Sequence, residues 1–271
     1  MELKVENTKL AEVISVGTLE GKFESVVLNF KDDGLHIKSK DGDNTIMNLV
    51  FMPKTSFELY KEVKNLIGIR NSNILLNVLK SFNGIINLKV EKDLINIYDN
   101  KKVVTLKTAD VTYLDDNNLN ETPKVFEKFD AGVKINTDIL KNSIKNISIV
   151  KSDNIKINIK NKLLSIETGD EGFDKITEKI NCAYNNNVSA FFNSELFKNV
   201  VAVLKDEVII SLPKSNFPIQ LTTKTDNFHS KILIAPNDDL SEEVKEEKKV
   251  TTETTIDDLV EKEISSEDEL L

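Results

Sequence analysis

The sequence contains one pattern twice, as SVVLNFKDDGLHIKSKD at residues 25–41 and as NIKINIKNKLLSIETGD at residues 154–170. Alignment at an offset of 129 places Asn29 on Asn158 and Leu35 on Leu164. In both copies apolar and polar side chains alternate on either side of a short polar turn, which is typical of a β-hairpin with one buried face. A repeat separated by more than a hundred residues indicates two similar domains rather than a row of small repeats.

The segments around each copy extend the repeat. Helical periodicity follows Thr8, Ser72 and Ser194, which are each expected to cap a helix, and Thr137 or Asn136 is expected to cap a fourth. Alternating segments predict strands at 2–5, 23–30, 35–39, 46–52, 57–60, 85–90, 94–98 and 103–106, the last running on toward Tyr113, and then at 133–135, 154–159, 163–167, 174–182, 207–212, 218–223 and 230–234. Each half follows the order β-α-β-β-β-α-β-β-β, which predicts an α+β fold.

A polar connector separates the halves. The segment YLDDNNLNETPKVFEKF at 113–129 is rich in Asn and Asp, contains Pro123 and has no helical or strand period, so we expect an exposed loop. It divides the chain into an N-terminal domain at 1–112 and a C-terminal domain at 130–237. Residues 238–271 have the composition of an acidic, disordered tail.

The charge is unevenly distributed. The whole chain has a net charge of −9, but the tail alone holds 14 acidic residues against 4 lysines. The remaining 237 residues are nearly neutral, with 31 acidic and 32 basic residues. A neutral body can bind nucleic acid if its lysines are gathered on one surface.

No catalytic or metal-binding motif stands out. His36 and His229 have no partner at ligand spacing, so a structural or surface role is expected for both. The carboxylate pairs 115–116 and 238–239 fall in solvated sequence, where no perturbed pKa is expected. The loop after Asp41 lacks the spacing of a calcium site, and GTLEGK at 17–22 lacks that of a phosphate loop. We therefore expect a protein that is not an enzyme and that needs no metal or cofactor.

The sequence has the features of an intracellular protein. Its single cysteine, Cys182, cannot form an intramolecular disulfide, lies in a strand pattern and is expected in the core. The start of the sequence lacks the pattern of a signal peptide, and no apolar run reaches membrane-spanning length.

Lysines provide the positive signal. They occupy the non-core faces of all four predicted helices: Lys9, Lys80, Lys141, Lys145, Lys198 and Lys205. Solvated helix faces often carry lysines, so each position alone has an ordinary explanation. If the four helices share one surface, however, their lysines could contact a phosphate backbone without reading bases.

The segments GLHIKSKDGDNTIMNLVF (34–51), SFELYK (56–61) and FPIQLTTKTDNFHSKILIAPN (217–237), together with the two-fold repeat, resemble the DNA sliding clamps of the PCNA type. The similarity extends over nearly all of 1–237 and excludes the tail. It implies the DNA clamp fold, with helices on the inner face and antiparallel sheets outside. It also implies a ring, usually of three chains, around double-stranded DNA, with the six lysines facing the channel.

The same resemblance implies partners. One chain would pair with the next along a seam between 102–113 and 174–184, forming a homotrimer. DNA polymerase, a clamp loader and other replication and repair proteins would insert a short motif into a groove beside the connector. The groove residues are Lys40, Leu119, Pro123, Val125, Pro218, Ile234, Ala235 and Pro236. Lys40, Asn44 and Ser15 depart from common family residues, which affects partner preference and the strength of DNA contact.

Three alternatives follow for the function of the protein, and two for the role of its tail. The main prediction is a processivity factor for DNA polymerase that is associated with DNA in the cytoplasm, nucleoid or nucleus. A clamp-fold scaffold that binds partners without encircling DNA is the second, and a hydrolase acting through Asp115 and Asp116 has almost no support. For the tail, apolar residues with helical spacing at 256–264 suggest that it folds back onto the connector groove; simple repulsion of DNA from the outside of the ring is the alternative.

Overall fold

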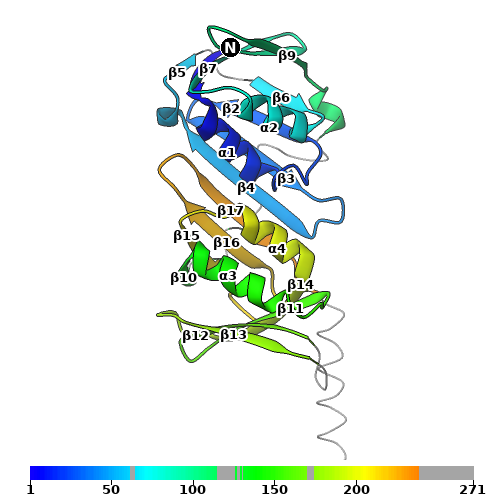
Figure 1. Ribbon diagram of the computed structural model, residues 1–271, viewed down its shortest axis with the longest axis vertical. Helices are drawn as coiled ribbons and strands as arrows, with labels where there is room; N and C mark the ends of the chain where they lie inside the picture. The colour runs from blue at the N-terminus through cyan, green and yellow to red at the C-terminus, as the bar shows by residue number, and fades with distance from the viewer. Residues whose placement is uncertain (62–64, 115–125, 127–128, 130, 170–173, 238–271) are drawn as a thin grey trace, which may run out of the picture.

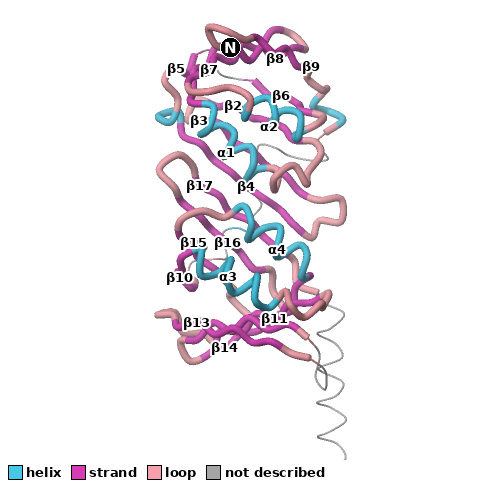
Figure 2. The backbone as a smooth tube through the Cα atoms, in the orientation of Figure 1, coloured by secondary structure: helices cyan, strands magenta, loops and turns pink. Residues whose placement is uncertain are grey.

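The computed structural model describes residues 1–61, 65–114, 126, 129, 131–169 and 174–237. Figure 1 shows an elongated molecule whose two halves follow one another along the long axis. Both the ribbon and the tube view place the helices of these residues on one side of the sheets (Figure 2). The result is one layer of helices over a layer of antiparallel strands, as the sequence predicts for an α+β fold.

The first half contains nine strands, two helices and two one-turn 3₁₀ helices within its described residues. In chain order these are β1 (Glu2–Glu6), α1 (Asn7–Gly17), β2 (Val26–Lys31), β3 (Gly34–Lys40), β4 (Ile46–Pro53), η1 (Lys54–Ser56), β5 (Leu59–Lys61), β6 (Asn65–Ile69), α2 (Ser72–Lys80), β7 (Ile85–Glu91), β8 (Leu94–Tyr98), β9 (Val103–Lys107) and η2 (Val111–Tyr113).

The second half repeats this order without an equivalent of β5. Its described elements are β10 (Val133–Asn136), α3 (Thr137–Ile147), β11 (Asn154–Lys160), β12 (Leu163–Thr168), β13 (Ile176–Asn181), β14 (Asn187–Asn193), α4 (Ser194–Val203), β15 (Glu207–Ser211), β16 (Ile219–Lys224) and β17 (His229–Ile234).

The strands form three sheets. Their orders are β5-β1-β7-β8-β9, β10-β15-β16-β17-β4-β3-β2-β6 and β13-β12-β11-β14. The eight-stranded sheet takes four strands from each half, because β17 pairs with β4 in an antiparallel register from His229↔Phe51 to Ile234↔Ile46. A continuous ladder of backbone hydrogen bonds therefore joins the halves into one unit.

Each half has one more strand before its second helix than the sequence pattern predicts. The additional strands are β6, which pairs with β2, and β14, which pairs with β11. In β6, a side chain at Gly68 would lie 2.5 Å from the carbonyl oxygen of Ala109. Because glycine interrupts the apolar alternation that identifies strands, β6 was not recognisable from periodicity.

Two further expectations are corrected. The strand expected to run toward Tyr113 ends at Lys107, and Val111–Tyr113 forms a 3₁₀ turn whose start is held by the Asp110 carboxylate. Ser72 and Ser194 are the first residues of their helices, while the preceding Asn71 and Asn193 provide the caps. Each asparagine oxygen accepts a hydrogen bond from the backbone N–H three residues later at 3.0 Å.

Polar side chains of the eight-stranded sheet hold the end of α1. Ser39 Oγ donates to the carbonyl of Gly17 at 2.6 Å, and Asn48 Nδ2 donates to that of Val16 at 2.6 Å. These carbonyls have no partner within the helix, so buried side chains of β3 and β4 satisfy them. A side chain at Gly17 would lie 2.9 Å from Ile37, so glycine permits the close approach of α1 to the sheet.

Buried Asn7 connects the two helices of the first half. Its Nδ2 donates to the carbonyls of Leu79 at 3.1 Å and Phe82 at 2.8 Å, and its Oδ1 accepts from Gly84 N at 3.0 Å. We expect Asn7→Ala to lower the free energy of unfolding by about 2–3 kcal/mol, because it removes three hydrogen bonds between a buried side chain and the backbone. Urea denaturation measures this loss.

The exposed residue Asn77 on α2 supplies the matched control. Asn77→Ala should change the unfolding free energy by less than about 0.5 kcal/mol. Equal effects of the two substitutions would contradict the role assigned to Asn7.

Candidate nucleic-acid and partner interfaces

The lysines singled out in the sequence all belong to the helix layer. Lys9 is on α1, Lys80 ends α2, and Lys198 is on α4. Lys141 and Lys145 lie one turn apart on α3, and Lys205 follows the end of α4. Buried residues occupy the other faces of these helices, so the sequence periodicity correctly assigned the core-facing sides.

These lysines differ in their solvent exposure and in their contacts with other groups of the protein. Lys80, Lys145 and Lys205 are exposed, whereas Lys9 Nζ lies 3.6 Å from the Glu6 carboxylate. Lys141 Nζ donates to the carbonyl of Leu204 at 2.8 Å, at the C-terminal end of α4. A cation at this end of a helix stabilises the carbonyls and the negative end of the dipole. Lys141 therefore has a structural contact that the sequence did not indicate.

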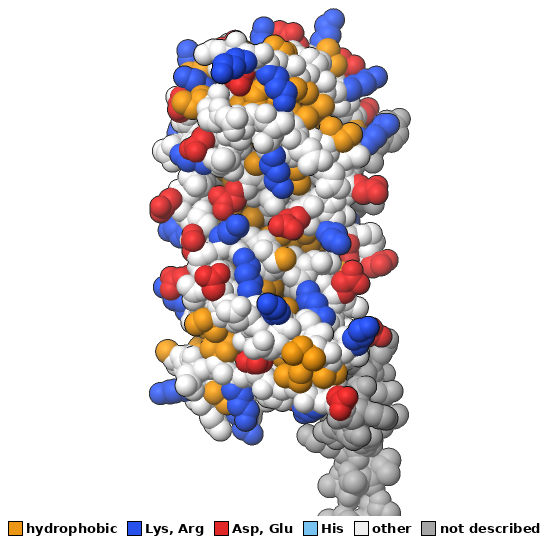
Figure 3. Space-filling view, viewed as in Figure 1, with side chains coloured by type: hydrophobic (Ala, Val, Ile, Leu, Met, Phe, Trp, Pro, Cys, Tyr) orange, Lys and Arg blue, Asp and Glu red, His pale blue; other side chains and the backbone are white. Residues whose placement is uncertain are grey.

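Acidic side chains interrupt the lysines. The helices of the described chain carry five lysines and three acidic residues, Glu12, Asp138 and Glu195. In the view that faces the helix layer, blue and red side chains are intermixed (Figure 3). The surface is therefore only weakly positive, and any phosphate contact there is expected to be weak and sensitive to salt.

The opposite face of the eight-stranded sheet brings one of the predicted groove residues, Lys40, together with residues of three other strands. Cross-strand register places Lys40 of β3 beside Met47 of β4, Met47 beside Leu233 of β17, and Leu233 beside Gln220 of β16. Gln220 Oε1 is buried and has no hydrogen-bond partner among the described residues. A buried acceptor without a partner is costly, so a donor from a bound segment would be favourable here.

The register separates the groove residues predicted from the sequence. Ile234 is fully buried and pairs with Ile46 on the helix-facing side of the sheet. The side chain of Leu233 lies on the opposite side of the sheet, in the cross-strand row that contains Met47 and Lys40. Met47, Leu233 and Gln220 were missed because only the pairing of β4 with β17 brings them together. Pro218, Ala235 and Pro236 lie at the ends of β16 and β17, and the predicted residues Leu119, Pro123 and Val125 fall outside the described residues.

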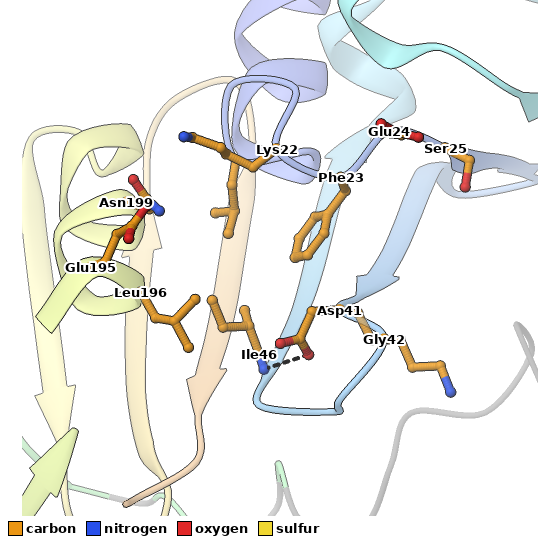
Figure 4. Close-up of a pocket in the computed structure, with 12 residues that line it drawn as sticks. Lys22, Phe23, Glu24, Ser25, Asp41, Gly42, Ile46, Glu195, Leu196 and Asn199 are labelled. Carbon is orange, nitrogen blue, oxygen red and sulfur yellow. Dashed lines mark hydrogen bonds between the residues drawn. The ribbon is translucent and has the colours of Figure 1, made fainter. Parts of the chain in front are cut away.

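A cleft of about 390 Å³ lies where the two halves meet. Leu19, Phe23, Ile46 and Leu196 line it, together with Lys22 and Asn199. Figure 4 shows Leu196 of α4 pointing toward Ile46, with Phe23 above them and Lys22 directed toward α4. Asp41 accepts a hydrogen bond from Ile46 N at 2.9 Å and closes the hairpin between β3 and β4. The cleft therefore contains the contact between the α1–β2 loop and the helix of the other half.

The potential reactive groups have structural partners. Burial raises the pKa of the Cys182 thiol, whose Sγ donates to the carbonyl of Tyr184 at 3.3 Å, so the thiolate is disfavoured. His36 Nε2 lies 2.8 Å from the Asp33 carboxylate. Within the described part of the chain, no three His, Cys, Asp or Glu residues form a cluster suited to a metal ion. Among the described helices, none combines the length and apolar character needed to cross a bilayer.

Comparison with solved structures identifies the fold. The chain aligns with A. fulgidus PCNA, in a structure with the C-terminal region of FEN-1 bound, at a TM-score of 0.74 and 17% identity over 87% of this chain and 98% of that one. Entamoeba histolytica PCNA gives 0.74 and 19% over 87% and 98%. A PCNA2-PCNA3 complex from Sulfolobus tokodaii gives 0.71 and 20% over 88% and 99%. No protein-family model and no curated protein sequence matches the chain.

The chain has the fold of the PCNA sliding clamps. The α+β architecture and the resemblance found in the sequence are thus confirmed at the level of the fold. Because the identities are low, ring assembly, DNA contact and partner binding are argued separately from the chain's own residues.

Lys141 and Lys145 provide a test of the helix layer. Lys141→Met should lower the free energy of unfolding by about 1–2 kcal/mol, because it removes a charged donor from the Leu204 carbonyl. Lys145→Met removes the same charge from an exposed position and should change it by less than about 0.5 kcal/mol. Thermal or urea unfolding of both variants measures the difference; equal stability would show that the Lys141 contact is unimportant.

Proposed function

We propose that this protein is a sliding clamp, a closed ring of identical chains that encircles duplex DNA without sequence specificity and tethers DNA polymerase and other proteins to it. The supporting observation is the junction between the two halves of one chain. Because the halves are equivalent, the contact that joins them also describes how one chain could join the next. We further propose that the halves 1–112 and 130–237 are the repeating domains of the ring.

The unpaired strand edges support this assembly. The strand β17 of the second half pairs with β4 of the first half. Their counterparts by position in the repeat are β9 and β13, which lie at the ends of their sheets. Such edges carry free backbone N–H and C=O groups that favour pairing. Transfer of the β17–β4 register predicts Val104 opposite Ile176, and Leu106 opposite Asp174, of two neighbouring chains. Only 103–107 of the expected seam segment 102–113 is strand.

Exposed apolar side chains support the same seam. Leu19 and Ile149 occupy equivalent positions, directly after Thr18 and Ser148. Thr18 donates its backbone N–H and its hydroxyl to the carbonyl of Ile14, and Ser148 donates the same two groups to that of Ile144. Leu196 and Ile74 are equivalent as the residues bound to the capping Asn193 and Asn71. Within one chain, Leu19 and Leu196 both line the cleft between the halves. Ile149 and Ile74 are 77% and 51% exposed, so a contact between chains would bury both.

This assembly is head to tail, because β9 and β13 are different surfaces. A head-to-tail contact forms a ring when its rotation closes. The helix layer would then line the inside, and Lys80, Lys145, Lys198 and Lys205 would contact phosphates, with smaller contributions from Lys9 and Lys141. Weak contacts suffice because a closed ring cannot leave DNA by simple dissociation.

Partner proteins and the clamp loader would bind on the outer face. The proposed groove contains Lys40, Met47, Leu233 and Gln220, with Pro218, Ala235 and Pro236 at its border and the connector residues Leu119, Pro123 and Val125. The apolar members suit an inserted apolar or aromatic side chain. In this proposal the protein has no catalytic step, cofactor or metal, and it is associated with DNA inside the cell.

One observation favours a second function, a clamp-fold scaffold that binds partners without encircling DNA. The helix layer carries three acidic residues among its five lysines, and Lys9 and Lys141 already have protein partners. Such a surface could be too weakly basic to retain DNA.

The seam is tested by Ile149→Asp. Its side chain is exposed in the single chain, so the fold should persist, but a buried carboxylate at the seam should prevent assembly. Light scattering should give a mass near three chains for the unmodified protein and one chain for the variant. The control is Ile139→Asp, which alters a 50% exposed isoleucine of α3 away from the proposed contact. A single-chain mass for the unmodified protein at all concentrations would argue against a self-closing ring.

DNA contact is tested by alanine at Lys80, Lys198 and Lys205 together. Each phosphate contact contributes a slope of about 0.9 to the dependence of log affinity on log salt. The variant should therefore bind duplex DNA more weakly, with a smaller slope, in fluorescence anisotropy. Alanine at Lys54, Lys92 and Lys160 removes three exposed lysines outside the four α-helices and should have little effect. Unchanged binding in the first variant would favour the scaffold.

A further inference from the structure

The outer face extends beyond the proposed groove into a further surface, which shares Lys40 and Met47 with it. The side chains of Met47, Leu49 and Phe51 alternate with buried residues along β4 and are half-buried on its outer side. Lys40 borders them on β3, and Lys231 and His229 border them on β17, opposite Leu49 and Phe51. These six residues, here called the basic-apolar strip, form an apolar row with cationic or titratable side chains on both sides.

The strip has no matching acidic border on these neighbouring strands. The outward positions of β3 next to it are His36, Lys38 and Lys40, and those of β17 are His229, Lys231 and Leu233. Beyond His229, the register continues to Lys224 on β16. Asp33 lies nearby, paired with His36. A ligand for this surface should therefore combine apolar side chains with negative charge.

The chain itself contains such a segment. Residues 238–271 carry 14 acidic residues and 4 lysines, while Ile256, Leu259, Val260 and Ile264 provide apolar groups at helical spacing. The segment follows closely on β17, which borders the strip. Leu233 is four residues before Asn237, whose N–H is held by the carbonyl of Phe191 at 2.8 Å. We propose that residues 238–271 fold back and bind the basic-apolar strip, with 256–264 on the apolar row and their carboxylates beside Lys40 and Lys231.

The dimensions fit this occupant. From Met47 to Phe51 a strand advances about 13 Å at about 3.3 Å per residue. A helix from Ile256 to Ile264 advances about 12 Å at 1.5 Å per residue, so its apolar side chains match the length of the row. The 18 residues between Asn237 and Ile256 can span up to roughly 60 Å, which is ample for a target on the strand next to β17.

Attachment to the same chain strengthens a weak contact. A flexible link of this length holds the segment at an effective concentration of about 1 mM, so millimolar intrinsic affinity suffices for substantial occupancy. Salt would weaken the contact, since the Debye length falls from about 10 Å at 0.1 M to about 3 Å at 1 M. The contact does not require ring formation. The bound segment would also compete with partner proteins, because the strip shares Lys40 and Met47 with the proposed groove. This consequence rests on the proposed function.

The full chain offers a direct test because it contains no tryptophan and one cysteine. Cys182→Ser with Ser265→Cys allows a single bimane label on the segment, and Leu49→Trp places a contact quencher in the strip. We expect loss of bimane emission at low salt and recovery at 1 M salt. The matched control, Ile139→Trp, places tryptophan at an exposed position on the helix side and should not quench.

Charge reversal identifies the binding surface. Lys40→Glu with Lys231→Glu should restore the emission, whereas Lys151→Glu, at an exposed site outside the strip, should not. Equal emission from the two tryptophan variants, or stronger quenching by Ile139→Trp, would overturn the proposal. Measuring emission and mass on the same samples separates the two ideas: quenching in a single-chain species supports the strip contact even if ring formation fails.

Discussion

The pairing of β17 with β4 is the interaction on which the rest of the structure depends. Six residue pairs, from His229↔Phe51 to Ile234↔Ile46, turn two separate sheets into one sheet of eight strands. Because side chains alternate across a strand, this register also decides which residues face the helices and which face outward. It puts Ile232 and Ile234 on the side of the helices, in the core, and Leu233 and Lys231 on the opposite side of the sheet, where Leu233 is buried and Lys231 is exposed.

Two surfaces with different chemistry follow from that sheet. On one side, α1 is tied to the sheet through Ser39 and Asn48, and the helices present a sparse mixture of lysines and carboxylates. Such a surface is suited to transient phosphate contact and poorly suited to tight binding. On the other side, β4 presents an apolar row between basic neighbours. In our proposal, proteins and peptides rather than DNA bind this outer surface.

The repeat within the chain is the basis of the proposed assembly. Within one chain, β17 of the second half pairs with β4 of the first half. The edge strands β9 and β13 are the counterparts of β17 and β4 in the repeat, so the same pairing could form between two chains. The equivalent positions are not chemically identical. Leu19 is buried within the chain, whereas its counterpart Ile149 is exposed. In the proposed ring, the seam between chains would therefore consist of separable contacts, whereas the junction within one chain is also covalently linked.

The sequence by itself determined the repeat, the α+β class, the helix faces and the separation of a neutral body from an acidic segment. These features depend on local periodicity and composition, which appear directly in neighbouring residues. Only the tertiary structure decided that Ile234 is core while Leu233, Met47 and Gln220 share the outer face, and that Lys141 binds the end of α4. The partners of each of these residues lie far away in the chain. Cross-strand register and helix packing bring them together, and no local pattern encodes either.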